Sequence, residues 1–277
     1  MLYLTKTQFN DIINHAKKEY PKECCGIVAG NVIQQSEVNS QQSKVVTKVY
    51  RMTNVSENPE TCYFMKPEEQ LKVFKEIRQL GIEMLGIYHS HAYSPAYPSQ
   101  RDCELAFYPE ADYIIISLRD FSNPEVRAYK ILEGKIVEEK IVIRKNILFV
   151  CVENSCRSQI AEGIVNNLYW QKFVAYSAGS KPSGVVNPNA IEVMKEIGID
   201  ISKQKSKGFD EVKDIEFDYV ITMGCGDECP SFVQSSMFKV QRLNWDIPDP
   251  KDKPIEFFRK VRGEIHKKIK ELVLEML

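Results

Sequence analysis

The apolar pattern of the chain changes near residue 144, and this change limits the folds that it can adopt. After that point short continuous apolar runs alternate with amphipathic segments of helical period; the runs are "KNILFVCV", "FVAYSAG", "FDYVITMG" and "FKVQRLNW". Strands and helices that alternate in this way are typical of a doubly wound parallel sheet. Before that point the order is irregular, with two helical segments among strands such as "CCGIVAGNVI", "KVVTKVYRM", "DYIIISL" and "KIVEEKIVI", which predicts a mixed sheet. We therefore expect an α/β protein of two domains, residues 1–143 and 144–277, with the boundary near Arg144 and Lys145.

Composition narrows the class of protein. The chain has 277 residues, enough for two domains, and its 43% hydrophobic and 27% charged residues are typical of a globular protein. A formal net charge of -1 gives no basic field, so we expect no nucleic-acid partner. No apolar run has the length of a membrane span and the N-terminus lacks a signal-peptide pattern, so we expect a cytoplasmic protein that does not associate with membranes. In such a setting the eight cysteines suggest reactive thiols or metal ligands rather than a disulfide scaffold.

The stretch "GIYHSHAYSPAYPSQRD" contains two of the four histidines of the chain. His89 and His91 lie two residues apart at the end of a predicted strand, so their side chains point to the same side. Together with Asp102 they would supply three ligands and leave a fourth position open, as catalytic zinc sites do. Two histidines alone more often belong to a polar surface turn, and both interpretations stay open at this point.

The wider pattern carries a resemblance. It reads His-Ser-His, seven residues, Ser99, two residues and Asp102, with Glu23 upstream in "PKECCGIVAG". This pattern resembles the JAMM (MPN-plus) metalloprotease family, whose domain has a cytidine-deaminase-like mixed sheet. The resemblance implies that Zn²⁺ is held by His89, His91 and Asp102. It also implies that Glu23 is the general base and that Ser99 stabilises the oxyanion.

The same resemblance implies a reaction class. JAMM enzymes hydrolyse amide or isopeptide bonds after the C-terminal glycine of ubiquitin-like proteins, and short prokaryotic forms act on ubiquitin-like sulfur carriers, for example by releasing an amino acid. An alternative is a module that binds ubiquitin-like partners without cutting them. Ser90 is expected to orient the loop. Cys24 and Cys25 are either packed small hydrophobes or extra thiols near the metal.

A second candidate site lies in "FVCVENSCRSQ". Cys151 ends an apolar strand, and a helix begins near Arg157. A loop of backbone N–H groups at a helix N-terminus binds a tetrahedral oxyanion, and the same field favours a thiolate nucleophile. Arg157 can bind two oxyanion oxygens, and the Ser158 hydroxyl can hydrogen-bond the thiolate. The candidate oxyanion-binding residues are Asn154, Ser155, Cys156, Arg157 and Ser158.

The second half resembles the low-molecular-weight tyrosine phosphatase superfamily and, more closely, its thioredoxin-coupled arsenate reductases. Supporting matches continue through "YSAGSKPSGVVNPNAIEVMKEIGIDISKQKSKGFDEV" and "WDIPDP", in which Asp249 matches the general acid of the family. Cys225 and Cys229 in "MGCGDECP" favour a reductase, because a phosphatase needs no further thiols. The alternatives are ordinary semi-buried cysteines, a partial metal site, and a phosphatase that acts on protein phosphotyrosine.

The resemblance implies a thiol relay. Cys151 attacks arsenate while Asp249 protonates the departing oxygen, and Cys225 then attacks the sulfur of the adduct so that arsenite leaves. Cys229 finally attacks the Cys151–Cys225 bond, and thioredoxin or a similar reductant reduces the resulting Cys225–Cys229 disulfide. The whole chain is thus expected to be a bifunctional enzyme.

One position departs from the family pattern. Members that bind potassium beside the loop use groups that match Asn154, Glu162 and Ser177, plus an aspartate where this chain has Lys207. We expect the Lys207 ammonium to substitute for the ion, the alternative being a solvated surface lysine.

Overall fold

The structure is a computed structural model that describes residues 1–34, 42–224 and 240–275. The chain divides into two units, Met1–Ile143 and Arg144–Leu277, and each is described by itself. Strand β8 (Ile141–Cys151) begins in the first unit and supplies most of its length to the second. The single strand expected for "KIVEEKIVI" (residues 135–143) is divided between two strands. Strand β7 ends at Glu139, and β8 starts at Ile141 and runs without a break through Arg144.

The first unit contains a mixed sheet, which confirms the sequence-based expectation. Strands β1 and β3 pair in parallel, as do β4 and β5, and the other neighbours are antiparallel. In the order of the sheet the strands are β1 (Leu2–Thr5), β3 (Gln42–Met52), β2 (Cys25–Gln34), β4 (Glu83–His91), β5 (Asp112–Ser117), β6 (Glu125–Leu132) and β7 (Lys135–Glu139). Because β4 and β5 are parallel neighbours, the side chains at their carboxyl ends share one edge of the sheet.

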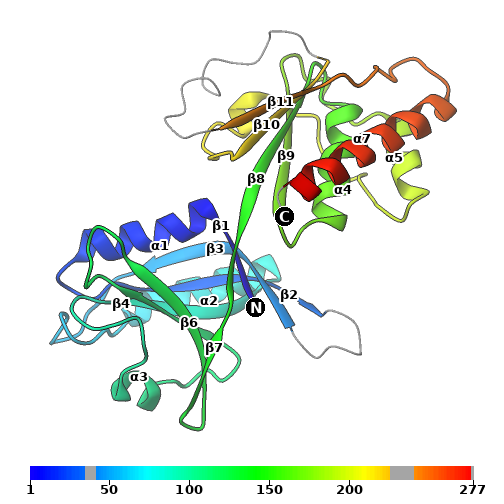
Figure 1. Cartoon of the computed structure of the whole chain (residues 1–277). Helices are drawn as coiled ribbons and strands as arrows, with labels where there is room; N and C mark the ends of the chain where they lie inside the picture. Colours follow the sequence, from blue (N-terminus) through cyan, green and yellow to red (C-terminus); the bar gives the residue numbers. More distant parts are fainter. Residues whose placement is uncertain (35–41, 225–239, 276–277) are drawn as a thin grey trace. The chain divides into compact units, whose positions relative to one another are not determined.

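Two helices cover the central strands of this sheet (Figure 1). Helix α1 (Lys6–Glu19) starts at a Thr5 capping box, and α2 (Pro67–Leu80) ends at Gly81, whose φ of 64° suits a left-handed helix end. Strand β5 is buried throughout, and its alternate residues belong to two different cores. Ile114 packs in the core that contains α1, and Ile115 packs in the core that contains α2. The sheet is thus the middle layer of the unit.

The second unit is built on a parallel sheet, as the alternating pattern predicted. Strand β8 lies between β9 (Phe173–Gly179) and β10 (Tyr219–Met223), and β11 (Gln241–Trp245) pairs with β10. All of these pairs are parallel, so their carboxyl ends meet at one edge. Cys151 is the last residue of β8 and lies at that edge.

Helices α4 (Arg157–Leu168), α5 (Pro188–Lys195) and α7 (Ile255–Glu275) pack together on one face of the parallel sheet (Figure 1). On β8, Phe149 points into this helical core, whereas its neighbour Val150 points into a separate cluster on the other face. Val212 and partly buried side chains near the short 3₁₀ helix Phe209–Glu211 cover that second face.

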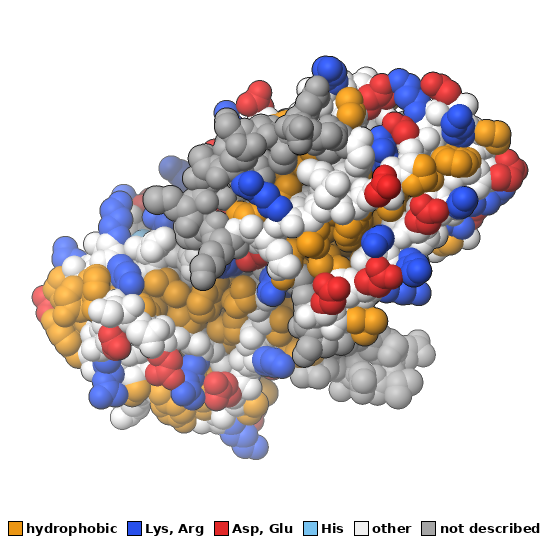
Figure 2. Space-filling view, turned by 45° about the horizontal axis from the view of Figure 1, so that its top comes forward, with side chains coloured by type: hydrophobic (Ala, Val, Ile, Leu, Met, Phe, Trp, Pro, Cys, Tyr) orange, Lys and Arg blue, Asp and Glu red, His pale blue; other side chains and the backbone are white. Residues whose placement is uncertain are grey.

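Acidic and basic side chains are interspersed on the face of the molecule shown in Figure 2, in keeping with the net charge near zero. Within the described ranges, the helices are too short or too polar to cross a bilayer.

Candidate functional sites

Strand β4 fixes the positions of two histidines. His89 lies opposite Cys25 of β2 and Ile115 of β5, so both neighbouring strands hold its backbone. Both imidazoles are buried, and their Nε2 atoms lie 3.1 Å apart. The period of the strand therefore brings the two rings to one point, as the sequence predicted.

Asp102 reaches this point from the five-residue helix α3 (Gln100–Glu104). Its Oδ1 lies 3.2 Å from Nε2 of His89, and its Oδ2 lies 3.5 Å from Nε2 of His91. One ligand atom from each of the three residues fits within 4.8 Å of the others. Hydrogen bonds from His89 and His91 outweigh the effect of burial and hold the pKa of Asp102 well below its usual range.

The three side chains fit a zinc ion by their donor chemistry. Two imidazole nitrogens and a carboxylate oxygen are ligands that Zn²⁺ prefers, and three protein ligands leave one position open. Nδ1 of His91 lies 2.9 Å from the carbonyl oxygen of Pro95, an acceptor that would hold a proton on Nδ1 and leave Nε2 to the metal when zinc binds. Burial lowers the pKa of His89, which keeps its ring neutral and able to bind metal.

Glu23 lies directly before the buried residues that lead into β2. Its backbone N–H donates to Pro59 at 2.7 Å, and the Asn54 amide donates to its carbonyl at 2.9 Å. Its side chain lines a cavity of about 120 Å³ together with His91, Ser99 and Asp102. Burial raises the pKa of Glu23 to about 7, a value suited to a general base.

Ser99 is the N-cap of α3 and holds Asp102 in place. The Ser99 hydroxyl donates to Oδ2 of Asp102 at 2.6 Å, and the Ser99 N–H donates to the same oxygen at 2.7 Å. The Asp102 N–H donates back to the Ser99 hydroxyl, which completes a capping box. This supporting role was missed from the sequence, although the Ser-x-x-Asp spacing is its signal.

Ser90 ties β4 to the residue after Glu23. Its hydroxyl accepts from the Cys24 N–H at 2.8 Å, and its own N–H donates to the Cys24 carbonyl. Cys24 and Cys25 are buried in different cores, and burial raises the pKa of the Cys24 thiol to about 12. Both cysteines are thus packed residues, and neither belongs to the group of possible metal ligands found among the described residues.

Tyr63 was not anticipated from the sequence. Its ring stacks on His89, with the ring centroids 4.7 Å apart and the planes inclined by 26°. It also lines the cavity. Tyr63 lies in an irregular segment before α2, and no local pattern links it to β4.

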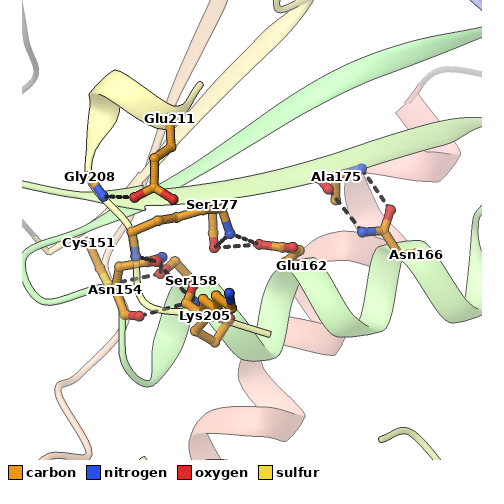
Figure 3. A network of polar contacts seen from close by, with 12 residues as sticks. Cys151, Asn154, Ser158, Glu162, Asn166, Ala175, Ser177, Lys205, Gly208 and Glu211 are labelled. Atoms are coloured by element: carbon orange, nitrogen blue, oxygen red, sulfur yellow. Dashed lines mark hydrogen bonds and ion pairs between the residues drawn. The ribbon is translucent and has the colours of Figure 1, made fainter. Parts of the chain in front are cut away.

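The second site gathers around Cys151 in the loop before α4 (Figure 3). The Cys151 sulfur lies 3.0 Å from the Ser158 hydroxyl oxygen, which accepts a hydrogen bond from the Asn154 amide at 2.8 Å. Because that oxygen already accepts, the Ser158 proton is free to be donated to a Cys151 thiolate. The structure therefore brings the nucleophile, the serine and the asparagine together.

Asn154 shapes the loop. Its φ of 49° is left-handed, and its side-chain oxygen accepts from the Gln159 amide at 2.9 Å and from the Lys207 N–H at 2.8 Å. Elsewhere in the loop, the Ser155 hydroxyl lies 3.5 Å from the sulfur of Cys156, and burial raises the pKa of that thiol to about 11. Cys156 thus stays protonated at neutral pH.

Arg157 is buried at the start of α4 and meets the predicted general acid. Its Nη2 lies 2.7 Å from Oδ2 of Asp249, and its Nη1 donates to the carbonyl of Ile247 at 3.1 Å. The Asp249 side chain is 54% exposed, so solvent reaches its carboxylate.

Lys207 lies among the groups expected to surround an ion. Its Nζ lies 3.2 Å from the carboxylate of Glu162 and 3.4 Å from the hydroxyl of Ser177. The Ser177 hydroxyl also hydrogen-bonds Glu162, and Figure 3 shows Glu162 on α4 and Ser177 on the neighbouring strand β9. The lysine is therefore part of a cluster and not a freely solvated side chain.

Cys225 and Cys229, which are expected from the sequence to form a thiol relay, lie outside the described residues. Gly224, directly before them, has a φ of 65°, and a Cβ there would come within 2.8 Å of Nη1 of Arg157.

Comparisons with known proteins match each half of the chain to a different family. The family model described as prokaryotic homologs of the JAB domain matches residues 5–132, and the model of low molecular weight phosphotyrosine protein phosphatases matches residues 146–277. A CysO-cysteine peptidase of Mycobacterium tuberculosis is 35% identical over 132 residues, which cover 48% of this chain and 84% of the relative.

Two relatives match the other half of the chain. A glutaredoxin arsenate reductase of Synechocystis sp. is 37% identical over 134 residues, which cover 48% of this chain and 98% of the relative. An arsenate reductase of Staphylococcus aureus is 42% identical over 125 residues, which cover 44% of this chain and 91% of the relative. The chain therefore belongs to the prokaryotic JAB family in its N-terminal half and to the low-molecular-weight phosphotyrosine phosphatase family in its C-terminal half.

Proposed function

We propose that the chain is a bifunctional enzyme. The N-terminal unit hydrolyses the amide bond between the C-terminus of a ubiquitin-like sulfur carrier and an amino acid, with zinc as cofactor. The C-terminal unit reduces arsenate to arsenite. The observation that carries the first activity is that His89, His91 and Asp102 form a group of possible metal ligands, and that His91 and Asp102 share a cavity with Glu23. The observation that carries the second is the contact of Cys151 with Ser158 at the loop that ends in Arg157.

In the hydrolase, each residue of the cavity has a separate task. Zinc bound by His89, His91 and Asp102 would polarise the scissile carbonyl and lower the pKa of water. Glu23 takes a proton from the attacking water and then delivers it to the departing amine. Ser99 fixes Asp102 in this structure, and its hydroxyl lies on the wall of the same cavity, where it donates to the oxyanion once its proton turns away from Asp102.

A carrier that ends in Gly-Gly and is extended by cysteine tests this activity. We expect the zinc-loaded protein to release cysteine and Glu23→Gln to release none while it keeps its zinc. His89→Ala should lose both zinc and activity. If the wild-type protein binds the carrier but leaves the bond intact, the unit is a binding module.

In the reductase, the described residues account for the first step. The Cys151 thiolate, hydrogen-bonded by Ser158, attacks arsenic, and Asp249 protonates the departing oxygen, which leaves as water. Arg157, which pairs with Asp249 in this structure, neutralises the oxyanion.

The electrons come from the other two thiols. Cys225 attacks the sulfur of Cys151, the S–As bond breaks, and its electron pair leaves with arsenic as arsenite. Cys229 then attacks Cys225 and frees the Cys151 thiolate. The Cys225–Cys229 disulfide is reduced by thioredoxin or a similar thiol reductant.

The described geometry of Cys151, Arg157 and Asp249 also suits a phosphatase, so the assay must separate the two reactions. We expect thioredoxin-coupled consumption of NADPH with arsenate that exceeds the hydrolysis of p-nitrophenyl phosphate. The double variant Cys225→Ser, Cys229→Ser should lose arsenate turnover, whereas the control Cys103→Ser in the other unit should keep it. Efficient ester hydrolysis without arsenate turnover would establish the phosphatase.

A further inference from the structure

The cavity beside Glu23 contains a cation that the hydrolytic roles do not use. Arg101 precedes the ligand Asp102 on α3 and lines the cavity together with Glu23 and Glu60. Its guanidinium makes no hydrogen bond or ion pair with any side chain or carbonyl in the described parts of the chain. Arg51 and Arg127 of the same unit pair with carboxylates instead. Arg101 thus has five N–H donors available to a ligand.

Arg101 is also held in position. The capping box between Ser99 and Asp102 fixes the turn on which it lies, so its Cα cannot move without displacing a candidate metal ligand. Its positive charge acts on Glu23 inside the cavity. It lowers the pKa of Glu23, whereas burial has the larger effect and raises that pKa.

The other charged side chains of the cavity wall are mostly acidic. Glu23, Glu60 and Asp102 line it, and they would repel an anionic ligand. An unpaired arginine in such a setting creates one place where a carboxylate is favoured, because its planar fork matches a carboxylate with two parallel hydrogen bonds.

We propose that Arg101 binds the free α-carboxylate of the amino acid that leaves the carrier. This inference rests on the proposed hydrolase function. In an amino-acid conjugate the carboxylate is attached to the carbon that bears the scissile nitrogen, so it stands next to the reacting bond. An isopeptide bond to a protein lysine carries no anion at that position. Arg101 therefore makes the site selective for a single terminal amino acid over a longer protein attachment.

The size of the cavity fits this role. Its volume of about 120 Å³ is far below the roughly 300–1,000 Å³ of pockets that enclose drug-sized ligands. A small amino acid is the type of leaving group that such a space accommodates.

Two conjugates of one carrier test the proposal. The carrier ends in Gly-Gly and is extended by cysteine in one substrate and by cysteinamide in the other, which removes the charge but keeps the shape. We expect the wild-type protein to prefer the acid by roughly tenfold in kcat/KM, mainly through KM. Arg101→Gln should abolish this preference, Arg101→Lys should restore part of it, and the exposed control Arg78→Gln should keep it.

The ratio of the two substrates within one variant cancels any effect of Arg101 on the ionisation of Glu23. Zinc content, measured in every variant, shows that the site has kept its ligands. Equal cleavage of both conjugates by the wild-type protein, or an unchanged preference in Arg101→Gln, would overturn the proposal while the hydrolase function stands. If the wild-type protein cleaves neither conjugate, both the proposal and the hydrolase function fail.

Discussion

The guanidinium of Arg157 forms an ion pair with the carboxylate of Asp249, with Nη2 2.7 Å from Oδ2. The residue that should bind the substrate anion is thus held by the residue that should protonate the leaving oxygen. An incoming oxyanion competes with Asp249 for the same guanidinium.

The Asp249→Asn substitution should therefore change phosphate affinity and arsenate turnover in opposite directions. The amide keeps the shape but removes a negative charge beside the anion site, so we expect phosphate to bind more tightly. Turnover of arsenate should fall by about 100-fold or more, because the general acid is lost. Calorimetry with phosphate and the thioredoxin-coupled assay measure the two effects. The exposed neighbour Asp246 supplies the control Asp246→Asn, and weaker phosphate binding in Asp249→Asn would contradict this account.

Lys207 should make the reductase indifferent to potassium. Its ammonium already lies 3.2 Å from Glu162, so an added ion gains no site. Arsenate turnover should be the same in potassium chloride and in choline chloride at equal ionic strength. Lys207→Ala should become potassium-dependent, whereas the exposed control Lys203→Ala should not. Marked activation of the wild-type protein by potassium would refute the substitution of the ion by the lysine.

Ser99→Ala should weaken metal binding. The variant removes the hydroxyl that donates to Oδ2 of Asp102 and so loosens that carboxylate. Loss of such a partner typically costs 10–100-fold in metal affinity, and we expect about tenfold here. Competition with a chromogenic chelator measures the zinc affinity. Ser122→Ala, in an exposed turn, is the control. An unchanged zinc affinity in Ser99→Ala would show that α3 holds Asp102 without the Ser99 hydroxyl.

Glu23 should titrate near neutrality only while the metal is absent. Burial raises its pKa to about 7, so in metal-free protein at pH 6 the carboxyl is largely protonated. A zinc cation nearby favours the ionised form, so metal addition should lower the pKa. Carbon-detected NMR of labelled glutamate follows this titration with and without zinc, and Glu23→Gln assigns the signal. A pKa near 4.5 in the metal-free protein would show that the carboxyl is hydrated.

Gly179→Ala should disturb the loop around Cys151. A Cβ at that position would lie 2.5 Å from the carbonyl oxygen of Val152 and 2.9 Å from the backbone nitrogen of Asn154. The backbone must move, so we expect a loss of roughly 1–3 kcal/mol in the free energy of unfolding and weaker phosphate binding. Chemical denaturation and calorimetry measure both. Gly263 in α7, where a Cβ meets nothing within 4 Å, gives the control Gly263→Ala.

Local periodicity explains how much of the structure the sequence predicted. The two-residue spacing of His89 and His91 placed both rings on one side of β4, because strand geometry depends on neighbours in sequence. Single residues likewise mark the cap of α1 at Thr5 and the end of α2 at Gly81.

The rest depends on contacts that no local pattern encodes. Tyr63 stacks on His89 across the fold, and β8 continues through Arg144, where the change of sequence pattern predicted a boundary. Helix α3 has only five residues, too few to show a helical period, so the Ser-x-x-Asp spacing had no predicted helix to cap. The position of Arg101 on the cavity wall, with its guanidinium unpaired among the described residues, likewise could not be predicted from the sequence.

The placement of Cys24 and Cys25 determines whether arsenite can bind to their two thiols. Trivalent arsenic binds most tightly when two neighbouring thiols coordinate it together. In the sequence, Cys24 and Cys25 look like such a pair. Their side chains enter different cores on opposite faces of the sheet, and burial keeps both thiols protonated at neutral pH. We therefore expect that arsenite, the product of the proposed reductase reaction, does not bind this pair of cysteines.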